Sequence, residues 1–561
     1  MPKTIAIGQK ARLKPVIEIA ARLGIPRRYL ELFGDYEAKV SLDILKKLKT
    51  KRKRARYIVV TGITPTHLGE GKTLTAIGLS MTLNKLGHRA ISAIRQPSLG
   101  PFFGIKGGGL GGGRSQVLPS DDISIHFTGD IHAVTASHNL LASFLDNHLI
   151  RGNQLEINPD KIFWNRVVDT NDRALRNIRI GVGSAYERKT RFDISASSEL
   201  MAILALSESI PDLRKRIGKI VVAMDRHGKP VTAEDLKAAG SMALLLTAAL
   251  KPNLVQTIEN TPCFVHTGPF ANITQGNSSI VADRMALGLA DFVVTEAGFG
   301  ADCGLEKFVD IKCRQSGLVP DAGVLVASVR ALKVHSGRFN TSPGKPLDAG
   351  IYRENLDALE QGSSNLKKQI DNVRIFGIPC IVSINKFPTD TDREIERVRR
   401  LALEYGAFDC VVSDFYRFGS KGGVQLAGSV MKTHDAKNSF RFLYPDKLTI
   451  KEKIETIAKR IYGAGGVRFE KEAAENIARF EKLKMGRLPV CMAKTHLSLS
   501  HDPKLKGRPE GFILPVRDVR PSLGAGFLYA LCGNVETMPG LPGHPVGERI
   551  DIDAKGRMVI K

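Results

Sequence analysis

Short apolar segments recur along the chain and alternate with longer segments of helical periodicity. The apolar segments are residues 57–61, 90–94, 220–223, 263–265, 292–294, 324–327 and 380–384. The helical segments between them include residues 74–86, 200–206, 236–250, 356–375 and 391–405. Because buried strands that alternate with helices are typical of parallel sheets, this pattern predicts an α/β fold with a mostly parallel sheet flanked by helices.

The remaining segments indicate how the chain is divided. Residues 13–20 and 38–48 have helical patterns, and the charged helical stretches 447–462 and 470–483 precede a Gly- and Pro-rich tail with β character. A chain of 561 residues is long for one core, because domains hold roughly 150 residues. We expect a large domain over residues 1–365 and two smaller C-terminal domains, one α/β over 366–450 and one α+β over 451–561.

The loop after the strand at 57–61 carries the strongest chemical signal. It ends in Gly71-Lys72-Thr73 at the mouth of the helix at 74–86, as in a P-loop, where backbone N–H groups and the helix dipole hold phosphates. Lys72 would reach the β- and γ-phosphates of a nucleotide and Thr73 would help to hold Mg²⁺. We predict a P-loop-type sheet, although Thr66 replaces the first glycine of the motif; the alternative is a Gly-rich turn with a solvated lysine. The predicted nucleotide-binding residues are Thr66, His67, Leu68, Gly69, Glu70, Gly71, Lys72 and Thr73.

Arg95 ends the strand at 90–94, and a loop with seven glycines among residues 104–113 follows it. Arg95 would lie at the same end of the sheet as the predicted P-loop, where its guanidinium could clamp a phosphoryl group. The alternative is a structural salt bridge. The glycines would let the backbone approach a ligand closely, or would form a flexible lid.

Carboxylates and imidazoles are concentrated in residues 121–132, which include His126 and Asp130. Their spacing does not match a zinc site, and oxygen ligation of a hard cation fits it better. The alternative is that these histidines are packed or exposed without binding an ion.

The net charge of +25 raises the question of nucleic-acid binding. The densest basic run covers residues 46–56, but only 6% of residues are aromatic and none interleave with the run as a stacking surface would require. An anionic small-molecule substrate would also benefit from a positive field. The chain shows no secretory signal, no apolar stretch of membrane-spanning length and seven scattered cysteines without a CxxC pair. We therefore expect a cytoplasmic protein that binds neither nucleic acid nor membranes.

Longer motifs occur in the order found in formate–tetrahydrofolate ligases, also called formyltetrahydrofolate synthetases. They are residues 64–73, 95–114, 126–132, 296–302, 326–333, 387–391, 491–495 and 538–542. The chain resembles this family over essentially its whole length. The resemblance implies an ATP-dependent carbon–nitrogen ligase, in which formate attacks the γ-phosphate to give formyl phosphate. The formyl group then passes to N10 of tetrahydrofolate, giving 10-formyltetrahydrofolate, ADP and phosphate.

The resemblance also implies roles for individual residues. The arginine that holds formyl phosphate falls on Arg95, so that Lys72 and Arg95 would be catalytic. Phe387 and Tyr416 fall on the aromatic positions that sandwich the pterin, with Tyr416 in place of the usual Trp. The middle domain would thus carry the folate-site loops. A tyrosine face is smaller than that of tryptophan but still supports stacking.

The resemblance also implies small-molecule substrates and cofactors. They are ATP with Mg²⁺, formate and tetrahydrofolate as substrates, and a monovalent cation (K⁺ or NH₄⁺) at His126 and Asp130. A homotetramer is also implied.

This chain departs from the family pattern in several ligand-facing loops. Arg114 replaces a tyrosine, Gln275 a histidine and Ser336 a glycine. Altered kinetics, a different folate or lost activity therefore remain open. The competing interpretations are another P-loop ligase that activates a carboxylate for a different acceptor, and a folate- or nucleotide-binding protein without catalysis.

Overall fold

The computed structural model describes residues 2–48, 55–106, 109–339, 341, 347–436, 438–533, 535–554 and 556–560. Most of the basic run at 46–56 (residues 49–54) and Gly107 and Gly108 of the glycine-rich loop lie outside the described residues.

A mostly parallel sheet of twelve described strands forms the centre of the molecule. Neighbouring strands from β15 to β19 all run parallel, as the sequence predicts. In spatial order they are β15 (Pro262–Val265), β4 (Ala90–Ile94), β16 (Phe292–Glu296), β3 (Arg56–Gly62), β17 (Ala322–Ala327), β18 (Cys380–Asn385) and β19 (Asp409–Ser413).

The other edge of this sheet is antiparallel. It contains β1 (Leu30–Phe33), β2 (Glu37–Val40), β14 (Asn253–Thr257) and the short strands β5 (Gly111–Gly112) and β6 (Ser115–Leu118). The predicted helix at 38–48 is wrong in its first half, because only α3 (Ile44–Leu48) is helical. Residues 38 and 39 pair with β14 instead, and this tertiary pairing overrides the local helical pattern.

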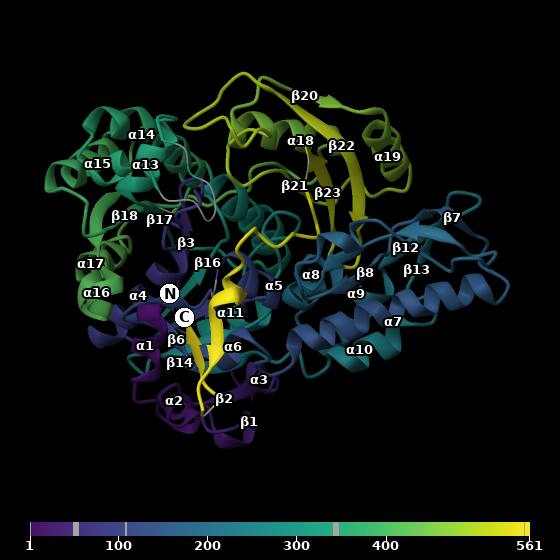
Figure 1. Ribbon diagram of the computed structural model, residues 1–561, viewed down its shortest axis with the longest axis horizontal. Coiled ribbons are helices and arrows are strands. Elements are labelled where there is room, and N and C mark those ends of the chain that lie inside the picture. Colours follow the sequence, from purple (N-terminus) through teal and green to yellow (C-terminus); the bar gives the residue numbers. More distant parts are fainter. Residues whose placement is uncertain are drawn as a thin grey trace.

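Helices cover both faces of the parallel strands (Figure 1). Alternate residues of β3 point to opposite faces: Ile58 and Val60 pack with α4, whereas Tyr57 and Val59 belong to the core on the other face. The first face carries α4 (Lys72–Lys85) and α17 (Val424–Lys432). The second carries α11 (Ile280–Leu289), α13 (Val329–His335), α14 (Leu356–Arg374) and α15 (Asp392–Glu404). The helices predicted at 74–86, 356–375 and 391–405 are thus confirmed.

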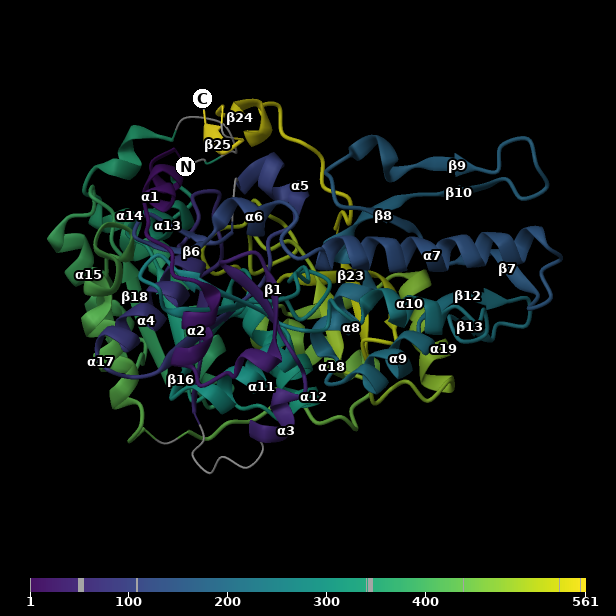
Figure 2. The ribbon, with the colours of Figure 1, turned by 90° about the horizontal axis from the view of Figure 1, so that it is seen from below.

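A separate arm projects from the sheet (Figure 2). Its core is built from α7 (Asp130–Ile150), α8 (Glu199–Leu206), α9 (Ile210–Gly218), α10 (Ala239–Leu246) and the antiparallel sheet of β7 (Ile157–Ile162), β12 (Val221–Asp225) and β13 (Pro230–Thr232). Short strands β8 (Arg166–Val168), β9 (Ile178–Ile180), β10 (Arg188–Thr190) and β11 (Phe192–Ile194) complete the arm. The predicted strand at 220–223 therefore exists, but its assignment to the parallel sheet is wrong. Its residues pack against the helices of the arm instead.

The C-terminal elements form a smaller α/β layer above the sheet in Figure 1. They are α18 (Ile450–Ile457), α19 (Lys471–Lys482) and the sheet β20 (Gly466–Phe469), β22 (Ile513–Ser522), β23 (Phe527–Cys532) and β21 (Val490–Ala493). The helices predicted at 447–462 and 470–483 are confirmed by α18, the following π-helical turn (Ala458–Tyr462) and α19. Residue 365 lies inside α14, and β18 and β19 continue the main sheet beyond it. The three-domain division stays a prediction.

The last hairpin, β24 (Ile550–Ile552) and β25 (Met558–Ile560), returns to the N-terminal helix α1 (Pro2–Gln9), where Gln9 donates to the Met558 carbonyl at 2.8 Å (Figure 2). Shorter helices include α2 (Val16–Arg22), α5 (Leu99–Pro101), α6 (Ser120–Ser124), α12 (Arg314–Ser316) and α16 (Phe415–Phe418).

No helix in the described parts of the chain has both the length and the apolar character needed to cross a membrane. The seven cysteines are all buried and free.

Candidate functional site

The loop between β3 and α4 (residues 63–71) is held in shape by Glu70. The buried Glu70 carboxylate accepts hydrogen bonds from the Thr66 N–H at 2.7 Å and the Thr66 hydroxyl at 3.0 Å. Its carbonyl accepts from the Asn385 side chain at 3.0 Å. Gly71 has a φ of 89°, and a Cβ there would lie 2.4 Å from Asn385 Nδ2, so a side chain at this position would be strained and would displace Asn385.

Unpaired backbone amides of the 63–71 loop and the Lys72 ammonium group lie together at the N-terminus of α4. Among the described residues, the backbone N–H groups of residues 69–73 have no protein acceptor, as expected at a helix N-terminus. The Lys72 stem runs back over Gly62, and its ammonium lies 3.6 Å from Glu70 Oε2 with the side chain 14% exposed. Together with the positive end of the α4 dipole, this arrangement is suited to an anion such as a phosphate.

Arg95, Glu296 and Thr73 meet where three neighbouring strands end. Arg95 follows β4, Glu296 is the last residue of β16, and Thr73 lies in the first turn of α4 after β3. Arg95 Nη2 lies 3.1 Å from Glu296 Oε1, and the Thr73 hydroxyl donates to Glu296 Oε2 at 2.5 Å. Burial alone would raise the pKa of Glu296, but the Arg95 charge and the Thr73 hydroxyl favour its ionised form, so the pKa falls below its ordinary value.

Side chains of helices α13 and α14 hold the 63–71 loop through hydrogen bonds to Thr64. Asn365 and Gln369 of α14 both donate to the Thr64 hydroxyl, at 2.8 and 2.9 Å, and Asn365 also accepts from the Thr64 N–H at 3.1 Å. His335 of α13 donates from Nε2 to the Thr64 carbonyl at 2.8 Å. Burial lowers the pKa of His335 to about 4, which keeps the ring neutral. The loop is therefore fixed before any ligand binds.

A buried ion pair ties this support to the C-terminal layer. Gln369 donates to Asp302 at 2.8 Å, and Lys494, just after β21, lies 2.9 Å from the same carboxylate. Asn365 also donates to the carbonyl of Gly507 at 2.8 Å. The C-terminal layer thus takes part in positioning the 63–71 loop.

Tyr416, on α16 after β19, lies against the glycine-rich loop. Its carbonyl accepts from the Arg114 N–H at 2.9 Å, and a Cβ on Gly112 or Gly113 would lie 3.6 or 2.8 Å from its ring. The Tyr416 side chain is 42% exposed. Arg114, which stands where the resemblance implies a tyrosine, therefore contacts this region through its backbone.

Phe387 follows the neighbouring strand β18. The Arg330 guanidinium lies 3.4 Å from the centre of the Phe387 ring. The backbone N–H of Phe387 donates to the Asp390 carboxylate at 2.8 Å. Phe387 and Tyr416 do not stack on each other or on any other aromatic ring in the described residues. Both residues follow strands at the carboxyl end of the sheet, as Lys72 and Arg95 do. Ligands of open α/β sheets bind at this end. The role of the two aromatic rings as a pterin sandwich stays a prediction.

The structure does not bring the side chains of His126 and Asp130 together. Asp130 is buried and accepts from Lys39 Nζ at 2.6 Å and from Asn253 at 2.8 Å, whereas His126 Nδ1 lies 2.7 Å from His132 Nε2. No group of three or more His, Cys, Asp or Glu side chains in the described part of the chain is arranged to hold a metal ion. A protein cation already neutralises Asp130, and the monovalent-cation site stays a prediction.

Sequence reasoning assigned no role to Glu296 or Asn385, which organise the site. Both are the final residues of strands, and polar groups in that position on central parallel strands were the available signal. Gln275, which stands where the resemblance implies a histidine, is fully buried, and its amide has no hydrogen-bond partner in the described chain. Nothing in the structure explains that substitution.

Comparison with known proteins identifies the family of the chain. The family model described as "Formate--tetrahydrofolate ligase" matches residues 2–560. A formate–tetrahydrofolate ligase of Roseiflexus castenholzii is 55% identical over 560 residues, covering 99% of both chains. Relatives of the same name from Saccharopolyspora erythraea and Desulforamulus reducens are 54% and 53% identical over 562 residues, each covering 100% of this chain and 99% of their own. The chain therefore belongs to the formate–tetrahydrofolate ligase family.

Proposed function

We propose that this protein ligates formate to tetrahydrofolate at the expense of ATP, through a formyl phosphate intermediate. The observation that carries the proposal is the cluster of Lys72, Arg95, Thr73 and Glu296 at the carboxyl ends of β3, β4 and β16. Two cations and a set of free loop amides converge there with a hydroxyl and an ionised carboxylate. Phosphoryl transfer requires mainly such positioning and charge stabilisation, because the protein has little covalent chemistry to perform.

The 63–71 loop acts in this proposal as a P-loop that binds the phosphates of ATP. Its amides and Lys72 would surround the β- and γ-phosphates. Thr73 and Glu296 would hold Mg²⁺, because a hydroxyl and an ionised carboxylate are the oxygen donors that this ion prefers. When bound, Mg²⁺ would supply charge neutralisation on the phosphates.

Arg95 is placed to bind the second reactant. A formate oxygen attacks the γ-phosphorus, the bond from that phosphorus to the ADP oxygen breaks, and formyl phosphate and ADP result. Nη2 of Arg95 contacts Glu296 and Nη1 donates to the Pro269 carbonyl at 3.2 Å, but the guanidinium is 24% exposed, so its remaining N–H groups could donate to the formate or to the transferred phosphoryl group. Glu296 thus orients Arg95 before substrates arrive.

The second half-reaction transfers the formyl group to the folate. N10 of tetrahydrofolate attacks the formyl carbon, the bond from that carbon to the phosphate oxygen breaks, and N10 loses its proton. Phe387 and Tyr416 would hold the pterin ring, because they flank the same sheet edge and aromatic faces stack on flat heterocycles. Both loops and Arg95 follow strands at the carboxyl end of the same sheet, which supports a transfer within one site.

A single assay tests the proposal. ADP release is measured with ATP and Mg²⁺ in the presence and absence of formate, and each of these reactions is run with and without tetrahydrofolate. The amount of 10-formyltetrahydrofolate is measured in parallel. We expect ADP and formyltetrahydrofolate in equal amounts only when all substrates are present. Formate-dependent ADP release without formylation of the folate would identify a ligase with another acceptor. No formate-dependent ADP release would identify a binding protein.

A further inference from the structure

Several lysine side chains of the described chain are 1% exposed or less, and most of them are neutralised by a carboxylate. These ion pairs are Lys39–Asp130, Lys312–Asp283, Lys333–Glu394 and Lys494–Asp302. Lys307 and Lys453 are fully buried as well, but neither forms an ion pair within the described residues. Burial of an ammonium group without a counter-charge costs free energy, so the contacts of these two lysines call for an explanation.

Lys307 lies in the helical segment that follows β16. Its ammonium donates to the carbonyls of Ala271 at 2.7 Å and Asn272 at 2.9 Å, and to Cys303 Sγ at 3.4 Å. Burial opposes the charged form, but the sulfur atoms of Cys303 and Cys491 favour it, and the pKa of Lys307 rises to about 12. Lys307 is therefore charged at neutral pH.

The acidic side chains of the same helical segment do not neutralise Lys307. Asp302 and Asp310 each form an ion pair with another cation. Burial and the charge of Asp310 raise the pKa of Glu306 well above its ordinary value, so that Glu306 is protonated at neutral pH. The Lys307 charge is therefore directed at the two backbone carbonyls.

These carbonyls belong to the 267–276 loop, which follows β15 and forms one side of the Arg95 site. The Pro269 carbonyl accepts from Arg95 Nη1 at 3.2 Å. The Thr267 carbonyl accepts from the backbone N–H of Gln96 at 2.7 Å. The loop therefore fixes both the guanidinium of Arg95 and the main chain next to it.

Ala271, whose carbonyl is bound by Lys307, lies close to the guanidinium. A Cβ on Gly298 would lie 2.8 Å from both Ala271 Cβ and Arg95 Nη2, so both groups pack against Gly298. The N–H of Gly298 in turn donates to the Gly276 carbonyl at 3.0 Å. A shift of the loop at Ala271 would therefore change the space that holds Arg95.

The backbone on both sides of Arg95 is strained. Thr267 has a φ of 56° and Phe299 a φ of 60°, in the left-handed region that β-branched and aromatic residues rarely adopt. The Thr267 hydroxyl is also buried without a hydrogen-bond partner in the described residues. Such backbone persists only where its surroundings hold it, and the fixed ammonium of Lys307 is one such contact.

We propose that Lys307 is a positioning residue that holds the 267–276 loop in the conformation that orients Arg95 for formate and the transferred phosphoryl group. The inference rests on the proposed function, because it requires Arg95 to act on these groups. Lys307 acts through Arg95 and not on a substrate. A buried charge that lowers stability is then retained because it fixes a catalytic cation.

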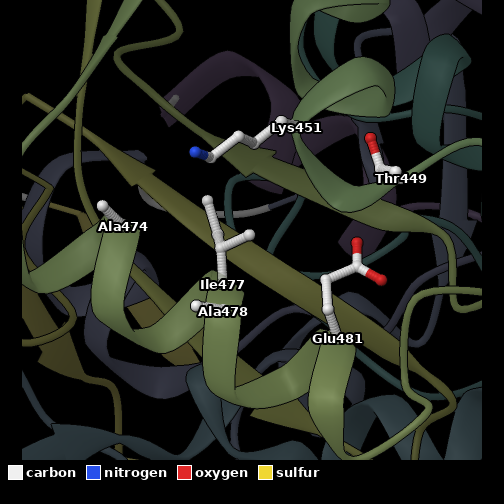
Figure 3. Close-up of a pocket in the computed structure, with 6 residues that line it drawn as sticks. All are labelled: Thr449, Lys451, Ala474, Ile477, Ala478 and Glu481. Atoms are coloured by element: carbon white, nitrogen blue, oxygen red, sulfur yellow. The ribbon is translucent and has the colours of Figure 1, made fainter.

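Lys453 provides a matched control. It lies on α18, the helix whose Lys451 borders a cavity of about 240 Å³ between α18 and α19 (Figure 3). The Lys453 ammonium donates to the carbonyls of Gly486 at 2.6 Å and Leu488 at 3.1 Å. Like Lys307 it is a buried ammonium on two backbone carbonyls, but its acceptors belong to the C-terminal layer.

A double-mutant cycle on the full-length protein tests the inference. Single-turnover formyl transfer and nucleotide affinity are measured on the wild type, Lys307→Met, Arg95→Ala and the double variant. We expect Lys307→Met to slow transfer about tenfold, because a displaced catalytic group loses rate, and to leave nucleotide affinity unchanged. In the Arg95→Ala background it should have no further effect. Lys307→Gln, which keeps an N–H donor, should recover part of the rate, and Lys453→Met should match the wild type.

The same tenfold loss in the Arg95→Ala background would overturn the inference, because Lys307 would then act independently of Arg95. A wild-type transfer rate in folded Lys307→Met, or an equal loss in Lys453→Met, would overturn it as well. If Lys307→Met does not fold, the cycle is run with Lys307→Gln under the same criteria. These outcomes leave the proposed function standing, whereas a wild type without formate-dependent ADP release would remove both.

Discussion

The proposed phosphate side of the site, around Lys72 and Arg95, and the proposed folate side, around Phe387 and Tyr416, are built in opposite ways, although both lie at the carboxyl end of one sheet. On the phosphate side, Lys72 and Arg95 are each paired with a mostly buried carboxylate, Glu70 or Glu296. On the proposed folate side, Tyr416 is 42% exposed, and its ring stacks on no other aromatic ring in the described residues.

The difference matches what each half would bind in the proposed function. Charge that develops on a phosphoryl group is stabilised best by cations that are already oriented, because reorganisation during the reaction would cost free energy. Carboxylates that hold those cations in place also allow them to be partly buried. A planar ring and a flexible tail need contact area more than fixed charges, and an open surface provides it. Variants on the two sides should therefore differ in size of effect and in the substrate affected.

The largest effect should come from Lys72→Ala. We expect at least about a thousandfold loss of formate- and folate-dependent ATP turnover, because an oriented charge next to the transferred phosphoryl is removed. Steady-state ADP release measures the loss, and circular dichroism checks the fold. Lys85→Ala, at the exposed end of the same helix α4, is the matched control. Near-normal turnover in a folded Lys72→Ala variant would exclude the P-loop assignment.

Arg95→Ala should come next and should separate the two half-reactions from nucleotide binding. We expect single-turnover formyl transfer to fall about a hundredfold while nucleotide affinity changes little, since the phosphates keep the loop amides and Lys72. Both quantities are measured on one preparation. Arg89→Ala, at the opposite end of β4 in a surface pair with Asp291, is the control. Parallel loss of affinity and transfer would assign Arg95 to nucleotide binding or to the fold.

Glu296→Gln tests whether the phosphate side is held by its carboxylates. We expect the free energy of unfolding to fall by about 2 kcal/mol at neutral pH, because Arg95 loses its partner in a mostly buried position. The pKa of Glu296 lies below its ordinary value of 4.5, so its stabilisation is complete above that pH and is lost as the pH falls through the lower folded pKa. Denaturant titrations from neutral to acid pH should show the two proteins converging only in acid. A constant difference would show that the Glu296 charge is not its source.

The smallest effect should come from Tyr416 on the folate side. Tyr416→Ala should raise the KM for tetrahydrofolate severalfold, since aromatic stacking contributes about 1 kcal/mol beyond area burial. Tyr416→Trp should be tolerated or should lower that KM. Phe418→Ala is the control, because Phe418 is 52% exposed on the same short helix, whereas Phe415 is fully buried. A larger effect of Phe418→Ala than of Tyr416→Ala would transfer the stacking role to Phe418.

Sequence patterns predicted the parallel strands well because those strands are buried on both faces. Strands such as β3 and β17 read as continuous apolar runs, a local property that needs no knowledge of their neighbours. The same pattern at 220–223 predicted a strand but could not reveal that β12 pairs with β7 and β13 in the arm. Residues 37–40 show the reverse, because pairing with β14 makes a strand of a segment with helical spacing.

The candidate site shows the same division between residues that local sequence places and contacts that only the tertiary structure forms. Lys72, Thr73 and Arg95 could be placed at one sheet edge from sequence, because each follows directly on a recognisable strand or begins its helix. The contacts of Glu296 with Arg95 and Thr73 join residues more than two hundred positions apart, and no spacing rule encodes them. The proximity of His126 and Asp130 in sequence was equally uninformative, since Asp130 turns toward Lys39 of β2.

By itself the sequence determined the mostly parallel α/β sheet, the loop–helix unit with Lys72 and the family membership, because these depend on local periodicity and on contiguous motifs. The tertiary structure alone decided which charges compensate one another and that the C-terminal layer supports the 63–71 loop through Lys494 and Asp302. The physical reason is that Coulomb and hydrogen-bond energies depend on distances of a few ångströms between side chains, and chain folding sets those distances across hundreds of residues.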